Sequence, residues 1–334
     1  MKILIIRFSS IGDIVVTTPI VRCLKQQLKC ELHYLTKPVN KQLLEANPYI
    51  DKIHTLDNDG NIPFAVLRNE QFDYIVDLHR NLRSLRVKLA LRKPFVVYRK
   101  LNLQKLLLVL FKLHCLPKKH LVDRYFDCVH RLGVHNDDHG LDYFINDSDR
   151  ITTELPNSFL EQGFIAIAVG SQHITKQLPE DKLIAIGRQL PYNIVLLGDR
   201  NDQTKALSIE KALGSKVFNA CGKFSMNQSV SVVQQSKVLL SGDTGLMHIA
   251  AALKHPIVAV FSNTVRDFGM YPYLPSSMQD RYTLVEVESL TCRPCSKMGF
   301  KQCPKKHFHC MKDIDNQTII DALEHFCKKS TPFL

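Results

Sequence analysis

The segment Gly242-Asp243-Thr244-Gly245 carries residue types that could bind a sugar and a phosphate. It follows the apolar run 238–240 and precedes a stretch with helical spacing. A helix that begins after a glycine-bracketed turn offers unpaired N–H groups and the positive end of its dipole, which favours anions. Asp243 could accept hydrogen bonds from sugar hydroxyls, and Thr244 could donate to phosphate. His248, one turn into the helix, either faces the same ligand or is simply half-buried in a capped helix.

Two loops earlier in the second half of the chain also carry polar side chains after apolar runs. In the loop 170–176, the hydroxyls of Ser171 and Thr175 and the ammonium group of Lys176 could bind a diphosphate. A single lysine in a loop is also typical of a solvated surface. The segment 198–202 ends another apolar run, and the carboxylates of Asp199 and Asp202 could hold a ribose.

A further carboxylate, Asp13, stands near the start of the chain. It ends the turn 9–13, between a β-rich apolar run and a predicted helix. A carboxylate beside a glycine turn could act as a general base. The alternative is a helix N-cap worth about 1 kcal/mol, and the sequence alone favours that cap.

The elements that must position these residues alternate in two successive cycles. Apolar or β-rich runs predict strands at residues 2–8, 31–36, 72–78, 164–170, 193–197, 217–220, 238–240 and 257–261. A helix is expected over 14–28, with Pro19 kinking or breaking it. This βαβ rhythm predicts an α/β protein with two Rossmann-like domains. The expected domains are residues 1–150 and 151–334, with the last helix packing back on the first domain.

The charge of the chain is concentrated in one segment. The formal net charge is +12, and residues 79–124 hold thirteen of the 44 Lys and Arg residues but one acid, Asp123. A field of this kind suggests an acidic partner such as a phosphorylated lipid, a nucleic acid or a polyanionic glycan. Little aromatic interleaving and no recognised module argue against nucleic acid. The apolar run 106–111, between two lysines, could rest on a membrane surface, or it could be an ordinary core helix within a solvated basic face.

The ten cysteines are expected to be reduced, because the chain begins with no recognisable secretion signal. Four of them fall within nineteen residues, and tetrahedral zinc would suit two such pairs. The alternatives are reduced structural thiols or a disulfide. The four candidates for this structural zinc are Cys292, Cys295, Cys303 and Cys310.

Several common nucleotide-binding patterns are absent. Neither Gly-x-Gly-x-x-Gly nor Gly-x4-Gly-Lys-Ser/Thr occurs, which argues against dinucleotide dehydrogenases and P-loop ATPases. Asp-x-Asp pairs, which metal-dependent sugar transferases use, occur at 57–59, 147–149 and 313–315. None follows a convincing core strand into a loop, so we discount them.

The order and spacing of these segments resemble the heptosyltransferase family of glycosyltransferases, glycosyltransferase family 9. The resemblance rests on KILIIRFSSIGDIVVTTP, DLHRNLRSL, GSQHITKQLP and GDTGLMHIAAAL with the following PIVAVFSNT. It implies the GT-B architecture, in which two Rossmann-like domains face each other across a cleft. The acceptor binds the first domain and the nucleotide sugar mainly the second. The middle motif has Leu178 where the family usually has an aromatic residue.

The resemblance also implies roles for individual residues. Asp13 would deprotonate the acceptor hydroxyl, and Lys176 would neutralise the departing diphosphate. The donor would be held by Ser171, Thr175, Lys176, Asp199, Asp202, Asp243, Thr244, Gly245, Leu246 and His248. The acceptor would be held by Ser9, Ser10, Gly12, His79, Arg80, Arg83 and Arg86.

The implied reaction is an inverting transfer of heptose from ADP-heptose to the lipopolysaccharide inner core. The acceptor would be phosphorylated Kdo-lipid A or a heptosyl group, and catalysis would need no metal or other cofactor. The protein is expected to be a cytoplasmic monomer, peripheral on the inner-membrane surface, with no nucleic-acid partner. The alternatives are transfer from another nucleotide sugar on the same fold and a non-enzymatic nucleic-acid-binding protein.

Overall fold

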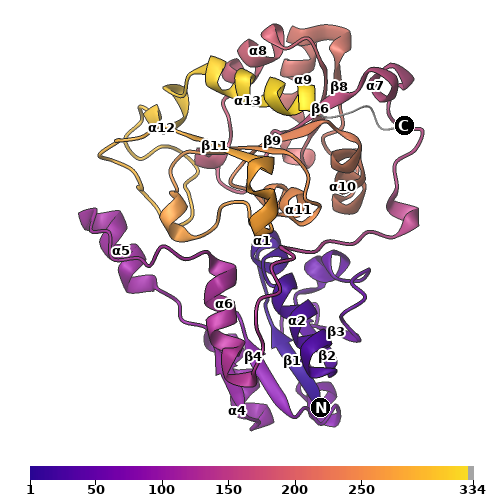
Figure 1. Ribbon diagram of the computed structural model, residues 1–334, viewed down its shortest axis with the longest axis vertical. Coiled ribbons are helices and arrows are strands. Elements are labelled where there is room, and N and C mark those ends of the chain that lie inside the picture. Colours follow the sequence, from indigo (N-terminus) through magenta and orange to yellow (C-terminus); the bar gives the residue numbers. More distant parts are fainter. Residues whose placement is uncertain (330–334) are drawn as a thin grey trace. The chain divides into compact units, whose positions relative to one another are not determined.

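A computed structural model describes residues 1–329, and the chain divides into two units (Figure 1). The first unit contains residues 1–101 and 119–144, and the second contains 102–118 and the chain from 145 onward. The division differs from the expected one mainly at 102–118. That segment holds α5 (Asn102–Phe111), and Lys112 after it donates from Nζ to the carbonyl of Pro294 at 2.7 Å. Side-chain contacts of this kind, which no local pattern reveals, join α5 to the second unit.

The sheet of the first unit has five parallel strands in the order β3-β2-β1-β4-β5. Buried parallel strands read as continuous apolar runs, so the expected central strand at the N-terminus is confirmed as β1. The strands are β1 (Lys2–Ile6), β2 (Glu31–Thr36), β3 (Lys52–Thr55), β4 (Tyr74–Asp77) and β5 (Phe95–Val97).

The helix expected over 14–28 is broken in two. Pro19 lies in the first turn of the second piece, where its missing N–H costs no hydrogen bond. The helices of this unit are α1 (Ile11–Val15), α2 (Thr18–Leu28), α3 (Phe64–Asn69), α4 (Leu82–Leu91) and α6 (Leu121–Val129).

The sheet of the second unit has six parallel strands in the order β11-β10-β9-β6-β7-β8. Numbered from its own first strand, this is the Rossmann order 3-2-1-4-5-6. The strands are β6 (Phe164–Ala168), β7 (Asn193–Leu197), β8 (Val217–Asn219), β9 (Val238–Gly242), β10 (Ile257–Phe261) and β11 (Tyr282–Glu286).

Helices cover both faces of this sheet. In Figure 1, α8, α9 and α13 lie on one side of it, and α10 and α11 lie on the other. The last helix, α13, packs against α8 and β9 to β11. Its expected packing on the first domain stays a prediction. The helices besides α5 are α7 (Asn157–Gln162), α8 (Glu180–Gln189), α9 (Gln203–Leu213), α10 (Met226–Gln235), α11 (Gly245–Ala252), α12 (His309–Lys312) and α13 (Asn316–Lys329).

The strand orders place one switch point in each sheet. The direction of winding reverses between β1 and β4 in the first unit, and between β6 and β9 in the second. Ligands of open α/β sheets bind beyond the carboxyl ends of the strands at such a point. The loops that follow these strands therefore define one candidate site in each unit. Within the described residues, no helix combines the length and the apolar character that crossing a membrane requires.

Candidate functional site

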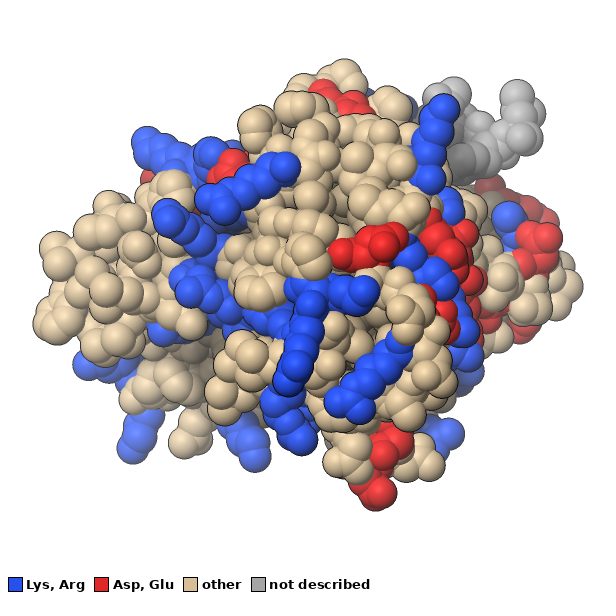
Figure 2. Space-filling model, turned by 90° about the horizontal axis from the view of Figure 1, so that it is seen from below, with Lys and Arg blue, Asp and Glu red and all other residues tan. Residues whose placement is uncertain are grey.

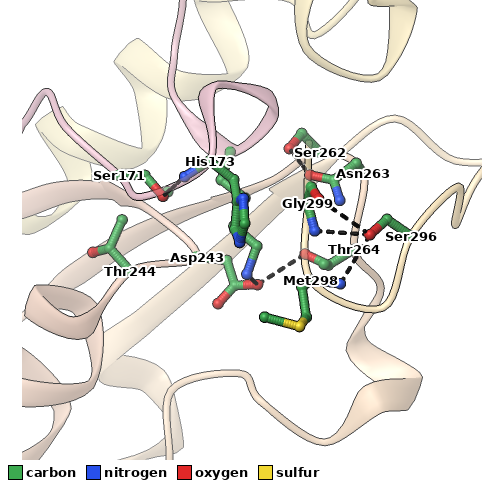
Figure 3. Close-up of polar contacts among 12 residues, drawn as sticks. Ser171, His173, Asp243, Thr244, Ser262, Asn263, Thr264, Ser296, Met298 and Gly299 are labelled. Carbon is green, nitrogen blue, oxygen red and sulfur yellow. Dashed lines mark hydrogen bonds and ion pairs between the residues drawn. The ribbon is translucent and has the colours of Figure 1, made fainter. Parts of the chain in front are cut away.

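At the switch point of the second unit, Lys176 and Asp243 form an ion pair. The Nζ atom of Lys176 lies 2.6 Å from Oδ2 of Asp243. The Thr264 hydroxyl donates to the same carboxylate oxygen at 2.9 Å (Figure 3). The side chains of Lys176 and Asp243 are 15% and 10% exposed, so the pair is largely shielded from water. Thr264 ends the segment PIVAVFSNT, which carries the resemblance, but sequence reasoning assigned it no role.

A glycine makes this approach between two loops possible. A Cβ atom on Gly242 would stand 2.2 Å from the backbone carbonyl oxygen of Lys176. The preceding residue is tied down as well, since the Ser262 hydroxyl donates to the carbonyl of Thr175. The Thr175 hydroxyl accepts a hydrogen bond from the backbone N–H of Phe300 at 2.8 Å. Thr175 therefore holds the loop in place, and its contact with a donor stays a prediction.

The turn after β9 opens helix α11 as expected. Thr244 is the N-cap, and its hydroxyl accepts a hydrogen bond from the N–H of Met247 at 3.3 Å. Gly245 and Leu246 are the first helical residues, and an α-helix cannot pair their N–H groups internally. His248 is 1% exposed, so the interpretation of a half-buried histidine is wrong. Its contact with a donor stays a prediction.

Asp199 and Asp202 close the turn after β7. The N–H of Asn201 donates to Oδ1 of Asp199 at 2.6 Å, and the N–H of Asp199 donates to Oδ2 of Asp202 at 2.9 Å. Burial raises the pKa of Asp202. A Cβ atom on Gly170 would lie 1.9 Å from Oδ2 of Asp202, so glycine leaves room for that carboxylate. The hydroxyl of Ser171, in the same loop, accepts from the N–H of His173 at 3.4 Å. Ribose binding by the two acids stays a prediction.

At the switch point of the first unit, Asp13 is fixed by an arginine that sequence reasoning missed. The Nη2 atom of Arg7 lies 2.6 Å from Oδ1 of Asp13. The other carboxylate oxygen accepts from the N–H and the hydroxyl of Ser10, both at 3.0 Å. Ser10 is the N-cap of α1, and Asp13 is the third helical residue and completes the capping box, so the interpretation of Asp13 as the N-cap is wrong. The Asp13 side chain is still 26% exposed.

Arg7 is itself locked in place. Its Nη1 atom donates to the Tyr125 hydroxyl at 3.0 Å and to the carbonyl of Leu78 at 2.5 Å, and Nε donates to the carbonyl of Ser9 at 2.8 Å. Burial acts to raise the pKa of Asp13, but the charge of Arg7 and the bonds from Ser10 outweigh it, and the pKa is lowered. Asp13 is therefore a charged carboxylate at neutral pH, oriented by Arg7, and its role as a base stays a prediction.

The loop after β4 is organised by Asp77, which is fully buried. Its carboxylate accepts from the N–H groups of His79 at 3.0 Å and Arg80 at 2.7 Å, and it pairs with Lys88 at 2.8 Å. Burial and the charge of Arg7 lower the pKa of His79 to about 4, so His79 is neutral.

Two of the predicted acceptor residues gather around one aromatic ring. Phe8 contacts His79 edge to face at 5.2 Å, and the Arg83 guanidinium lies 5.5 Å from the Phe8 ring. Gly12 is buried within α1, while Arg80 and Arg86 are exposed. The structure thus brings Ser9, Ser10, Asp13, His79 and Arg83 to one end of the first sheet.

The four clustered cysteines all lie between β11 and α13 as free thiols: Cys292, Cys295, Cys303 and Cys310. Burial raises the pKa of Cys310 to about 12. Among the residues that the structure describes, no three of these sulfurs lie within 4.8 Å of one another. The structural zinc therefore stays a prediction.

Comparison with known proteins identifies the family. The profile of glycosyltransferase family 9 (heptosyltransferase) matches residues 64–308. A curated relative, lipooligosaccharide heptosyltransferase 2 of Campylobacter jejuni, is 29% identical over 122 residues, which cover 36% of this chain and 35% of that protein. The match with this relative thus spans about a third of its length. Lipopolysaccharide heptosyltransferase 1 of Campylobacter coli is 24% identical over 297 residues, covering 79% of this chain and 84% of that protein.

Solved structures agree in fold. The family 9 glycosyltransferase of Veillonella parvula superposes with a TM-score of 0.76 at 20% identity, covering 98% of each chain. ADP-heptose LPS heptosyltransferase II of Escherichia coli has a TM-score of 0.72 at 19% identity, covering 98% of this chain and 99% of that one. These likenesses confirm the expected α/β fold of the GT-B class with two Rossmann-like domains. Since the family profile covers most of the chain, this protein belongs to glycosyltransferase family 9, the heptosyltransferases.

Proposed function

We propose that this protein transfers heptose from ADP-heptose to a phosphorylated acceptor of the lipopolysaccharide inner core, with inversion at the anomeric carbon. The observation that carries the proposal is the shielded Lys176–Asp243 pair beside the first turn of α11, at a Rossmann switch point. The names of the relatives support heptose as the sugar and lipopolysaccharide as the acceptor class. The acceptor is Kdo-lipid A or a heptosyl group already attached to it.

The second unit would stabilise the leaving group. As the bond from the anomeric carbon to the diphosphate breaks, negative charge builds on the phosphate oxygens. Preorganised N–H groups and a cation stabilise such charge without reorganisation. Lys176 provides the cation, and the first N–H groups of α11, from Gly245 and Leu246, provide the donors. Asp243 holds the ammonium in place until the more highly charged diphosphate attracts it. This arrangement neutralises the leaving group without any metal ion.

The first unit would activate the acceptor. Asp13 takes the proton of the acceptor hydroxyl, whose oxygen then bonds to the anomeric carbon from the face opposite the diphosphate, inverting it. The Arg7 contact keeps Asp13 ionised and aimed. Its low pKa makes it a modest base, which suits a reaction where the proton is lost late, as the sugar cation is already forming.

The basic segment would meet the anionic acceptor and the membrane that holds it. On α4 of the first unit, three leucines at helical spacing are exposed by 81%, 43% and 65%: Leu82, Leu85 and Leu89. Exposed Arg86 and Arg92 lie beside these leucines in the sequence. Over the face of the molecule drawn in Figure 2, Lys and Arg side chains are more widely spread than acidic ones. An apolar stripe flanked by bases suits an anionic lipid surface. We infer a monomer, peripheral on the cytoplasmic face of the inner membrane.

The test is a donor screen with purified protein and Kdo-lipid A. ADP-heptose should support transfer well above UDP-, GDP- and CMP-sugars. Asp13→Asn should lower kcat roughly 100- to 10,000-fold, the range of a general base, while ADP-heptose binding stays nearly unchanged. Faster turnover with another nucleotide sugar would replace heptose as the substrate. Wild-type turnover by Asp13→Asn would remove Asp13 from the mechanism.

A further inference from the structure

Two histidines and a glutamate meet inside the first unit, in a place that the proposed reaction does not use. Nδ1 of His33 lies 2.9 Å from Nε2 of His54. The Glu70 carboxylate faces both nitrogens, with one oxygen 3.8 Å from His33 Nδ1 and the other 3.9 Å from His54 Nε2. His33 is 1% exposed and His54 is 5% exposed, while Glu70 closes the outer side with a side chain 12% exposed. All three ligand atoms lie within 4.8 Å of one another.

The sheet register explains why these side chains meet. In the parallel pair β2–β3, His33 is opposite Lys52, and His54 follows two residues later on the same face. In the pair β1–β2, His33 is opposite Leu4 and Glu31 is opposite Lys2. Alternate residues of a strand share a face, so the polar groups of three strands are stacked together. Glu70 reaches them from the C-terminal end of α3.

The His33–His54 contact is a hydrogen bond in the absence of an ion, whereas the distances from Glu70 to both nitrogens are those of ligands around an ion. Two ligand atoms about 2 Å from one metal lie roughly 3 to 4 Å apart. Glu70 is too far from either histidine nitrogen for a hydrogen bond, at 3.8 and 3.9 Å, yet it faces both. A carboxylate placed in this way is at the separation expected across a shared cation.

The other nitrogen of His33 has the partner that metal-bound histidines commonly have. Nε2 of His33 lies 2.9 Å from Oε1 of Glu31. A carboxylate on that nitrogen holds the proton there and leaves the lone pair of Nδ1 directed at the cluster. This pairing orients the ring and strengthens it as a ligand.

We propose that His33, His54 and Glu70 bind a divalent transition-metal ion of the zinc type, with Glu31 orienting His33. Two imidazole nitrogens and one carboxylate suit Zn²⁺ and its neighbours, whereas Ca²⁺ and Mg²⁺ prefer all-oxygen sites. The ion joins β2, β3 and the end of α3. None of these elements carries Asp13, so the role of the ion is to stabilise the first unit.

Two lysines compete with the ion for Glu70. Nζ of Lys52 is 2.5 Å and Nζ of Lys2 is 3.2 Å from this carboxylate. The Lys52 side chain is 53% exposed, so it can turn outward when an ion enters. Removing it should therefore strengthen metal binding, whereas a network that is only a set of salt bridges would bind no metal in either form.

The test uses the 334-residue chain, stripped of metal with a chelator. The four clustered cysteines are changed to Ser so that their thiols do not bind the probe. On titration, the protein should bind one equivalent of Co²⁺, with visible absorption bands of the bound ion and no sulfur charge-transfer band. Zn²⁺ should displace the Co²⁺ and raise the Tm of the protein. His54→Gln and Glu70→Gln should each lose the bands, Glu31→Gln should weaken binding roughly tenfold or more, and Lys52→Ala should tighten it.

The matched control is His114→Gln, which removes an exposed histidine paired with Asp267 at 2.9 Å in the second unit. It should bind Co²⁺ like its parent. The proposal is overturned if the parent binds no stoichiometric ion, or if both His54→Gln and Glu70→Gln, folded by circular dichroism, bind as tightly as the parent. The Co²⁺ readout does not depend on heptose transfer, so it stands or falls separately from the proposed function.

Discussion

Gly242→Ala is the sharpest test of how the second unit builds its anion site. A Cβ atom there would lie 2.2 Å from the Lys176 carbonyl oxygen, where 3.4 Å or more is ordinary contact. The loop that carries Lys176 must therefore retreat by about 1 Å, and a misplacement of that size costs about 100-fold in rate. The clash is with backbone, so a stability loss of about 1–3 kcal/mol should accompany it.

The assay is ADP release with ADP-heptose and Kdo-lipid A, alongside ADP affinity and Tm. Gly187→Ala is the matched control in the same unit. Its added Cβ would lie 2.5 Å from Cδ1 of Leu213, the movable end of a side chain. We expect Gly187→Ala to keep ADP affinity and kcat, whatever its Tm. Wild-type kcat and ADP affinity in Gly242→Ala would refute the reasoning that this glycine sets the position of Lys176.

Three further outcomes follow from the first unit. Arg7→Met should move the acid limb of the kcat/KM profile to higher pH, because the arginine holds the pKa of Asp13 down; an unmoved limb would contradict this. Burial alone would raise the pKa of Asp137, but Arg22 lowers it to about 2, below the unfolded value of 3.8. The Arg22–Asp137 pair should therefore add about 2 kcal/mol to the free energy of unfolding above pH 4, and this contribution should disappear as the pH falls to 2. In Arg22→Met, unfolding curves should no longer show this pH dependence. Binding to anionic vesicles should weaken, because the apolar contact is lost while the bases remain, when serine replaces the exposed leucines of α4: Leu82, Leu85 and Leu89.

Most of the core strands could be predicted because burial on both faces makes each one a continuous apolar run. The strand β11 was missed. Its sequence, Tyr-Thr-Leu-Val-Glu, is mixed, and only Val285 within it is buried, as befits an edge strand. A kink or break of the helix at Pro19 could be predicted, because proline fits the first turn of a helix and not its interior.

The candidate site could be predicted only residue by residue. Asp13, Lys176 and Asp243 stand out because each follows an apolar run in a polar or glycine-containing loop. Their partners carry no such signal. Arg7 and Thr264 lie within segments that carry the resemblance, but nothing in their spacing shows that they hold Asp13 and Asp243 in place. His33 and His54 are 21 residues apart, and only the pairing of β2 with β3 brings them together.

The sequence by itself determined the elements, the glycine turns and the concentration of positive charge, because backbone preference and local composition act over a few residues. Only the tertiary structure decided which loops meet. Lys176 and Asp243 are 67 residues apart, and they pair because β6 and β9 are neighbours in the sheet. Strand order arises from burying all the apolar faces at once, a condition on the whole chain that no single segment records.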